Sequence, residues 1–515
     1  MNIILGPRDG RYSDCSQHYP ASPISHGRRN ISMPVIASLL PKRVHPANFR
    51  LASFWIFSAC LTSEKGRTVH APHGDHFPLL PAQLRTWNAQ IGDLTNPVFS
   101  VCDYLEIRGP VDPDLLRAAH LQVEREADAL RLGIITVEGE HRQFVHPDPT
   151  PLQWVDLSAR SDPAAAVAAW MAEDVHRPVD PLRLCGAAVI KTADDCFLLY
   201  WKVHHAVIDG WSLALIFNRM AAVYSALSEG RKYEKGMLQP FERLRENEAA
   251  YREGKRSLAD QAHWHSKLAD HPEPVGPSRR RAQVTAGRRL RHELAPDRVA
   301  RLGEIADGLG VTWSDLAISA MAAYVGSTVQ MPEVLLGLPT AGRLSPQVRN
   351  AVGMAMNILP LRVPFDDGSP LIGHAQRVSR EVRELLLHSR YPTAELSREM
   401  TERGGSGRLW AAMVNVMLFD HRLDFAGIPA IQHTVSIPLT VDMTVYLIQI
   451  ASDGTMELIL DTHPDLYSAA EAEAHLAGLL STFDAIEKAG PHTPLHALCP
   501  GPERSRAART SASTG

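Results

Sequence analysis

The sequence predicts an α+β protein built from two lobes. An apolar run rich in aromatic and β-branched residues, 197–203, leads directly into residues 211–224, whose apolar side chains recur at helical spacing. A strand followed by a helix in this way is typical of an α+β layer. Further along, the proline-rich stretch 271–277 cannot be regular structure, because proline fixes φ and lacks an N–H donor. It separates two parts that are each long enough to be a domain.

Composition narrows the class of protein. Hydrophobic residues make up 45% of the 515 residues, enough for a large core but too scattered for membrane spans. The 53 basic and 57 acidic residues give a formal net charge of −4, which indicates neither a nucleic-acid partner nor a membrane partner. Six cysteines lie far apart without paired spacing, which predicts free thiols in a reducing compartment and hence a cytoplasmic protein.

Shifts in composition predict the domain boundaries. Residues 1–75 are irregular, and their one apolar run, 54–57, is too short to span a bilayer and too far from Met1 for an ordinary signal peptide. We therefore expect a disordered leader or an upstream start codon there. The remaining expected parts are a first lobe at 76–240, a linker region at 241–285, a second lobe at 286–490 and a disordered tail at 491–515.

In the first lobe, periodicity predicts each element in turn. A helix opens at Pro81 and holds Trp87, and Asp112 is the expected N-cap of the next helix. The expected strands are residues 101–107, 182–191 and 196–203, the last two joined as a hairpin.

In the second lobe, Thr312 and Asp315 form an expected capping box at the start of a helix. Another helix should begin at Pro296, and a final one should end near Lys488. The expected strands are 289–294, 334–339, 413–420 and 456–461.

Residues 204–210, His-His-Ala-Val-Ile-Asp-Gly, stand where the strand ends and the helix begins. Adjacent side chains on a strand point to opposite faces, so one imidazole can face a cavity while the other turns inward. Histidine suits proton transfer near neutral pH. We expect Asp209 to hydrogen-bond inside the turn or to pair with a cation, and Gly210 to supply a positive φ. The plain alternative is two satisfied core histidines; a shared metal ion is disfavoured, because no partner ligands follow in a known spacing.

This stretch matches His-His-x-x-x-Asp-Gly, and the chain therefore resembles the chloramphenicol-acetyltransferase-like superfamily, specifically the condensation domains of nonribosomal peptide synthetases. Three further segments resemble motifs of those domains. They are Ala-Gln-x-Arg-x-Trp at residues 82–87, Leu-Arg at 130–131, and Gly-x-Pro-x-x-x-Arg at 337–343 followed by Gly-Met-x-x-Asn-x-Leu-x-Leu-Arg at 353–362. The resemblance covers roughly residues 76–490.

The resemblance implies two chloramphenicol-acetyltransferase-like lobes in a V shape with a tunnel between them. His205 is then the central residue, either as general base or by orienting the nucleophile. Gly210 is a candidate oxyanion donor through its backbone N–H, and Asp209 shapes the loop. His204 is expected to support the site, and Arg131 is expected to pair with Asp209.

The same resemblance implies the partners. A donor carrier protein brings the acyl group as a thioester on its phosphopantetheine arm, and an amine or hydroxyl, free or on an acceptor carrier, enters from the other side. No metal and no permanently bound cofactor are implied. Trp211, Met356 and Asn357 are expected to line the substrate tunnel.

Several branches of the superfamily share the motif. Cyclisation domains carry Asp in place of the histidines, epimerisation domains usually have Ser-Trp where this chain has Trp211-Ser212, and wax-ester synthases fit poorly with the 337–362 pattern. Without a visible carrier signature, we expect a free-standing, monomeric condensation enzyme that recruits separate carriers. The wording of the motifs resembles siderophore-type domains, which suggests an aryl or short acyl donor. Two alternatives stay open: an acyltransferase that uses acyl-CoA, and a catalytically degenerate recruitment platform.

Overall fold

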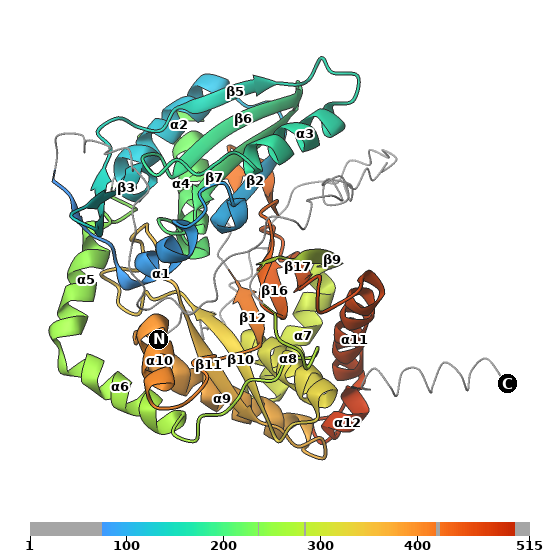
Figure 1. Cartoon of the computed structure of the whole chain (residues 1–515). Helices are drawn as coiled ribbons and strands as arrows, with labels where there is room; N and C mark the ends of the chain where they lie inside the picture. The colour runs from blue at the N-terminus through green and yellow to red at the C-terminus, as the bar shows by residue number, and fades with distance from the viewer. Residues whose placement is uncertain (1–74, 235, 283–284, 419–422, 500–515) are drawn as a thin grey trace, which may run out of the picture.

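The computed structural model of the chain describes residues 75–499, except 235, 283–284 and 419–422. The two lobes lie one above the other, each built on its own six-stranded sheet (Figure 1). The α+β fold class is therefore confirmed. The predicted leader and the tail beyond residue 499 lie outside the described residues. None of the helices in the described ranges is long and apolar enough to cross a membrane.

The first sheet runs in the order β13-β14-β2-β7-β6-β5. Its strands are β2 (Ser100–Arg108), β5 (Leu152–Asp156), β6 (Cys185–Ala193), β7 (Cys196–His204), β13 (Asp424–Phe425) and β14 (Ile428–Thr434). β6 and β7 form the predicted hairpin, and β7 pairs with β2 so that His204 lies opposite Ser100. The His-His motif at 204–210 thus begins at the end of a central strand, which is paired on both sides.

Helices cover both faces of this sheet because its strands alternate apolar side chains between them. On one face, α2 (Pro113–Glu126) and α4 (Gly210–Ser228) bury Leu105, Leu199 and Trp201. On the other face, α3 (Pro163–Val175) packs against β2, β6 and β7. Asp112 caps α2 by accepting from the N–H groups of residues 114 and 115, as predicted.

Two of the strands in the first sheet come from far along the chain. β14 pairs antiparallel with β2, placing Ala430 opposite Ile107. The sequence pattern assigned this segment to the second lobe, whereas the structure inserts it in the first sheet. The two lobes are therefore connected by the linker and also by the segment that contributes β13 and β14 to the first sheet.

The second sheet runs in the order β11-β10-β12-β16-β17-β9. Its strands are β9 (Arg288–Leu294), β10 (Glu333–Thr340), β11 (Asn357–Pro364), β12 (Ala412–Met417), β16 (Met443–Gln449) and β17 (Met456–Thr462). β10, β12 and β16 are parallel neighbours, and the other pairs are antiparallel. The predicted strands at 289–294, 334–339 and 456–461 are confirmed within a few residues, and so is the predicted strand at 413–420 as far as Met417; residues 419–420 lie outside the described residues.

One apolar core joins this sheet to its helices. The helices are α7 (Pro296–Gly308), α8 (Trp313–Val329), α9 (Leu371–Leu387), α11 (Ala469–Lys488) and α12 (Leu495–Leu498). The capping box of Thr312 and Asp315 starts α8, which is buried along nearly its whole length. α12 corrects the predicted tail boundary at 491, because Leu495 and Leu498 pack into this core.

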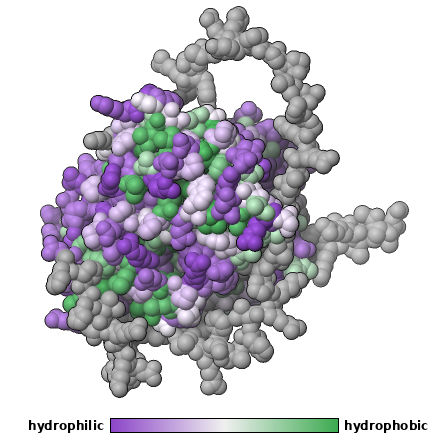
Figure 2. Space-filling view, turned by 90° about the horizontal axis from the view of Figure 1, so that it is seen from above, coloured by the Kyte–Doolittle hydropathy of each residue, from purple (hydrophilic) through white to green (hydrophobic). Residues whose placement is uncertain are grey.

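The linker descends from the first lobe to the second as two helices, α5 (Glu242–Glu253) and α6 (Lys255–Lys267) (Figure 1). The remaining elements are β1 (Phe77–Pro78), α1 (Pro81–Gln90), η3 (Pro97–Phe99), η4 (Asp128–Arg131), β3 (Leu132–Val137), β4 (Glu140–Val145), β8 (Thr285–Ala286), α10 (Thr393–Glu402) and β15 (Leu439–Thr440). On the face seen from above, apolar residues are interspersed with polar ones (Figure 2).

Candidate active site

The turn after β7 reverses the chain into α4. The N–H of His205 donates to the carbonyl of Phe99 (2.8 Å), and that of Val207 donates to the carbonyl of His204 (3.0 Å). Asp209 is the N-cap of α4, and its carboxylate accepts from the N–H of Ser212 (2.9 Å). Gly210 is the first residue of α4, so its backbone is helical there. The expected positive φ at Gly210 is wrong, because the capping by Asp209 already starts the helix.

His204 turns inward and is 2% exposed. Its Nδ1 accepts from the N–H of Ala206 (3.1 Å), so the proton must be on Nε2, which donates to Gln90 Oε1 (3.2 Å). The edge of Trp87 packs on the ring at 5.6 Å between centroids. Burial lowers the pKa of His204 to about 3. This imidazole is therefore neutral and supports the turn.

His205 is only partly buried, and its two nitrogens differ. Nδ1 lies 3.0 Å from the carbonyl oxygen of Ile208, which can only accept, so Nδ1 carries the proton. Nε2 then has a free lone pair. Burial lowers the pKa of His205, Arg85 lowers it further, and Asp209 opposes both. The ring is thus neutral at physiological pH and can accept a proton through Nε2.

Asp209 makes an ion pair with Arg343, from Oδ2 to Nη1 at 2.8 Å, with side chains 2% and 0% exposed. Oδ2 also accepts from the N–H groups of Ala355 (2.9 Å) and Met356 (3.2 Å). Burial alone would raise the pKa of this carboxyl, but Arg343 and the backbone donors hold it below its usual value. A carboxylate that accepts from four groups fixes the loop and transfers no protons.

The expected pairing of Arg131 with Asp209 is wrong. Arg131 ends η4, where its Nη1 donates to the carbonyl of His146 (2.8 Å) and its Nε to that of Glu124 (3.2 Å). The guanidinium of Arg131 therefore donates to these backbone oxygens and not to Asp209. The cation that Asp209 needs comes instead from the second lobe, from the arginine that closes the 337–343 motif.

Arg343 is satisfied on every side. Its guanidinium donates to Ser212 Oγ (2.7 Å) and to the carbonyls of Gly353 (2.7 Å), Ala351 (3.0 Å) and Ala341 (2.9 Å). Ser212 belongs to α4 of the first lobe. One side chain therefore ties the loop at 341–356 to the start of α4 and to the motif turn.

The three residues expected to line the tunnel, Trp211, Met356 and Asn357, each make hydrogen bonds that hold a different part of the site. The indole N–H of Trp211 donates to the carbonyl of Arg349 (2.9 Å). Met356 contributes its backbone N–H to Asp209. Asn357 begins β11, donates to the carbonyls of Ser389 (3.0 Å) and Tyr391 (2.7 Å) and accepts from Thr393 N (3.3 Å), so its amide holds the 389–393 loop.

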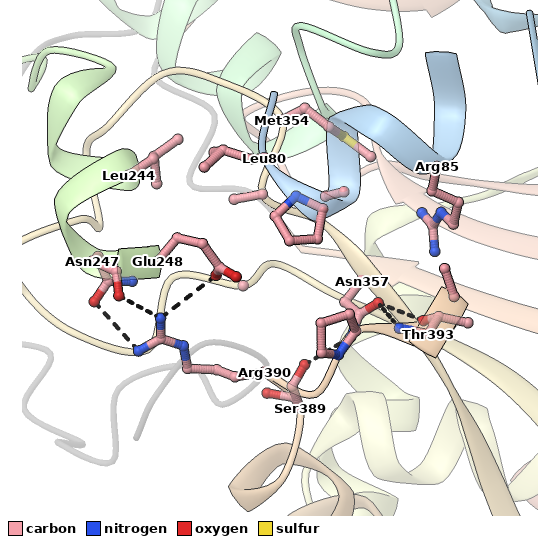
Figure 3. Close-up of a pocket in the computed structure, with 16 residues that line it drawn as sticks. Leu80, Arg85, Leu244, Asn247, Glu248, Met354, Asn357, Ser389, Arg390 and Thr393 are labelled. Carbon is pink, nitrogen blue, oxygen red and sulfur yellow. Dashed lines mark hydrogen bonds and ion pairs between the residues drawn. The ribbon is translucent and has the colours of Figure 1, made fainter. Parts of the chain in front are cut away.

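A pocket lies between the lobes beside this loop (Figure 3). Sixteen residues line it, from α1, α5, the 342–357 segment and the 389–394 segment: Leu80, Pro81, Ala82, Arg85, Leu244, Asn247, Glu248, Gly342, Met354, Ala355, Asn357, Ser389, Arg390, Pro392, Thr393 and Ala394. The pocket wall and the motif turn share Ala355, because its N–H binds Asp209. Of the expected tunnel residues, only Asn357 is in the wall.

Sequence reasoning missed the two arginines of this pocket. Arg390 is held by α5, since its guanidinium donates to the carbonyl of Asn247 (2.7 Å) and lies 4.2 Å above the ring of Tyr251. Arg85 points from α1 toward Asn357 and Thr393 (Figure 3). Across the described ranges, no group of three or more His, Cys, Asp or Glu is placed to hold a metal ion.

Comparison with known proteins identifies the family. Curated relatives include the isonitrile lipopeptide synthase of Streptomyces coeruleorubidus, 35% identical over 79% of this chain and 28% of the relative. Another is the dimodular nonribosomal peptide synthase of Bacillus subtilis, 31% identical over 80% of this chain and 18% of the relative. The chain thus spans less than a third of the length of these relatives.

Solved structures similar to this chain are also condensation domains of peptide synthetases. A mutant of the starter condensation domain of rhizomide synthetase RzmA in complex with C8-CoA has a TM-score of 0.75 and 30% identity, over 82% of this chain and 96% of that chain. The first condensation domain of the calcium-dependent antibiotic synthetase, in complex with a substrate analogue, has a TM-score of 0.75 and 28% identity, over 82% and 98%. The condensation domain family matches residues 73–488, which is most of the chain. The chain therefore belongs to the condensation domain family of nonribosomal peptide synthetases, whose members form amide bonds.

Proposed function

We propose that this condensation domain transfers an acyl group from the phosphopantetheine thioester of a donor carrier protein to an amine, with His205 as the central residue. The observation that carries the proposal is the state of His205: Nδ1 is engaged with Ile208, and Nε2 keeps its lone pair on a partly exposed ring. Condensation domains of this family work with carrier-bound thioesters.

The reaction balances through that nitrogen. The amine attacks the thioester carbonyl carbon and gives one proton to His205 Nε2, leaving a tetrahedral oxyanion. When the C–S bond breaks, the leaving thiolate takes the proton from Nε2, and the amide and a free thiol result. Gly210, at the N-terminus of α4, is placed where backbone N–H groups carry partial positive charge for such an oxyanion. Orientation of the amine by the same nitrogen would contribute alongside proton transfer.

The pocket beside Ala355 is a proposed entrance for one of the two substrates, since it is lined by both lobes and shares Ala355 with the motif turn through the hydrogen bond to Asp209, although His205 itself is not in its wall. The carrier arms would come from outside residues 73–488, either from separately supplied proteins or from neighbouring domains. The free thiols of Cys102, Cys185, Cys196 and Cys499 fit the proposed cytoplasmic location.

An acyl-CoA donor is the second candidate function. A related starter condensation domain has been solved with C8-CoA, and a variant of it with C8-CoA and Leu-SNAC. In this chain the two donors differ only in what carries the phosphopantetheine arm, so a direct comparison separates them.

The test offers the same acyl groups on a carrier protein and on CoA, with a panel of amines that includes Leu-SNAC, and detects products by mass spectrometry. The carrier-dependent function predicts faster turnover of the carrier thioester, and equal rates would support the CoA donor. Replacing His205 with Ala should lower turnover about 10²- to 10⁴-fold. Full turnover by His205→Ala would contradict the catalytic role. His204→Ala is no matched control, because it removes the support of the turn.

A further inference from the structure

Strand β14 is held against β2 by a buried contact between two side chains as well as by the backbone pairing. Gln432 Nε2 donates to Asp103 Oδ2 at 2.7 Å, and the two residues are 7% and 4% exposed. Both side chains lie on the same face of the sheet, because Gln432 stands opposite Leu105 and Thr434 stands opposite Asp103. The contact thus lies near the end of β14, where the chain leaves the first sheet for the second lobe.

One oxygen on each side of this contact is left over. Asp103 Oδ1 and Gln432 Oε1 are both buried, and neither has a hydrogen-bond partner among the described residues. An ionised carboxylate and an amide oxygen can only accept, so an ionised Asp103 would leave two buried acceptors unsatisfied, which is unfavourable. A proton on Oδ1 makes that oxygen a donor. The carboxyl and the amide, both planar, can then form two parallel hydrogen bonds, from N–H to Oδ2 and from O–H to Oε1.

The cations near Asp103 are already paired with other carboxylates. On β9, Arg289 donates to both oxygens of Asp461, at 2.8 and 2.7 Å, and Arg291 pairs with Glu457 of β17 at 2.6 Å. Burial raises the pKa of Asp103 to about 6, and the nearby hydrogen-bond donors and the two arginines only oppose that rise. A second hydrogen bond that exists only in the protonated form favours the neutral carboxyl further.

Two histidines also lie near this contact, and neither supplies a charge to Asp103. On the same face of the sheet, His120 of α2 packs against Trp201, and burial lowers its pKa, so its ring is neutral. His433 of β14 pairs with Glu106 of β2 at 3.0 Å on the opposite face. The protonation of Asp103 therefore depends on its burial and on Gln432.

We propose that Asp103 and Gln432 form a pH-sensitive clasp between β2 and β14, in which Asp103 Oδ1 carries a proton and donates it in a hydrogen bond to Gln432 Oε1. Loss of the proton leaves two buried acceptors at the contact and loosens β14 from β2. The same strand β2 begins at Ser100, which is paired with His204, so the clasp secures a neighbour of the motif strand. The clasp is independent of the reaction proposed for His205, and its tests measure no turnover.

Infrared spectroscopy reads the protonation state of Asp103 directly. Spectra of the full chain and of Asp103→Asn are compared across a pH series, and their difference isolates the carbonyl band of the protonated carboxyl. We expect this band to persist up to about pH 6 or above and then to be replaced by carboxylate bands. Carboxylate bands alone at about pH 5 would overturn the proposal and would indicate an ordered water between the two oxygens.

Urea unfolding measures the effect on stability. Because the folded chain binds this proton more tightly than the unfolded chain does, the stabilisation is complete below the ordinary pKa of an aspartate and is lost as the pH rises through the raised value. Asp103→Asn keeps the shape and supplies a permanent donor to Gln432. The unfolding equilibrium constant of the wild type relative to Asp103→Asn should therefore rise about 10-fold or more between about pH 5 and about pH 8.

The matched control is Asp461→Asn, the same substitution at a carboxyl that is 0% exposed and accepts from Arg289. It should lower the urea midpoint strongly at every pH, because it leaves the guanidinium without a charged partner. A ratio for Asp103→Asn that stays constant with pH would overturn the proposal. Failure of Asp103→Asn to fold would also overturn it, since the amide reproduces the neutral acid, and so would equal tolerance of both substitutions.

Hydrogen exchange places the change in the structure. At about pH 8, the amides of β14 should exchange faster in the wild type than in Asp103→Asn, and at about pH 5 the two proteins should exchange alike. The amides of β17, in the second sheet, should show no such difference. A difference spread equally over both strands would contradict a clasp between β2 and β14.

Discussion

Replacing Arg343 with Met should destabilise the protein severely. Replacing Arg131 with Met should destabilise it much less. The first change removes the cation from Asp209 while that carboxylate stays 2% exposed. Breaking one side of a buried ion pair costs about 3–5 kcal/mol, because the other charge is left uncompensated. Ser212 Oγ and three backbone carbonyls lose the same donor. We therefore expect a loss near the upper end of that range.

Urea unfolding of matched variants measures the effect. Arg131 donates to the carbonyls of His146 and Glu124 and, within the described part of the chain, to no carboxylate, so Arg131→Met should cost about 1–3 kcal/mol. A double-mutant cycle with Asp209→Asn should give a coupling energy above about 1 kcal/mol for Arg343 and close to zero for Arg131. Coupling of Arg131, rather than Arg343, to Asp209 would refute the pairing seen here.

Three further predictions follow from single contacts. Because the pKa of His205 lies below its ordinary value and the reaction needs the neutral ring, kcat/KM should hold its plateau below pH ~6.5 and fall only as the pH drops through the lowered pKa; an acidic limb above pH 7 would contradict this. Gly342→Ala should destabilise the protein by more than about 2 kcal/mol, because φ is +67° and a Cβ would lie 2.0 Å from the Ala355 carbonyl oxygen; its matched control, Gly230→Ala, has φ +64° with nothing within 4 Å and should cost about 1 kcal/mol. Thr312→Ala should cost about 1 kcal/mol in the same urea assay by removing the cap of α8, and no change would mean that the hydroxyl is dispensable.

The parts of the fold that could be predicted from the sequence are those that depend on local patterns. The capping box at Thr312, the cap at Asp112 and the hairpin of β6 and β7 each depend on residues close together in the sequence. The position of the motif at a strand end also follows from local periodicity, and β7 ends at His204.

The partner of Asp209 was not predictable in this way. Arg131 and Arg343 are both arginines that end a family-like motif, and no local pattern says which one reaches a carboxylate far along the chain. The fold decides it: η4 turns Arg131 toward backbone carbonyls, while Gly342 at φ +67° lets the 341–356 loop approach the start of α4. β14 was missed for the same reason, because a strand of one lobe that pairs in the sheet of the other has the sequence pattern of any strand.

The motif turn is completed by both lobes. Asp209 takes one donor from its own helix, at Ser212, and three from the second lobe, at Arg343, Ala355 and Met356. If the lobes moved apart here, Asp209 and Arg343 would separate, and each buried charge would lose its partner, which is unfavourable. Opening of the lobes is therefore expected to pivot about this contact and the β14–β2 pairing, so that the geometry of His205 persists while the pocket walls from α1 and α5 move relative to the 389–394 loop.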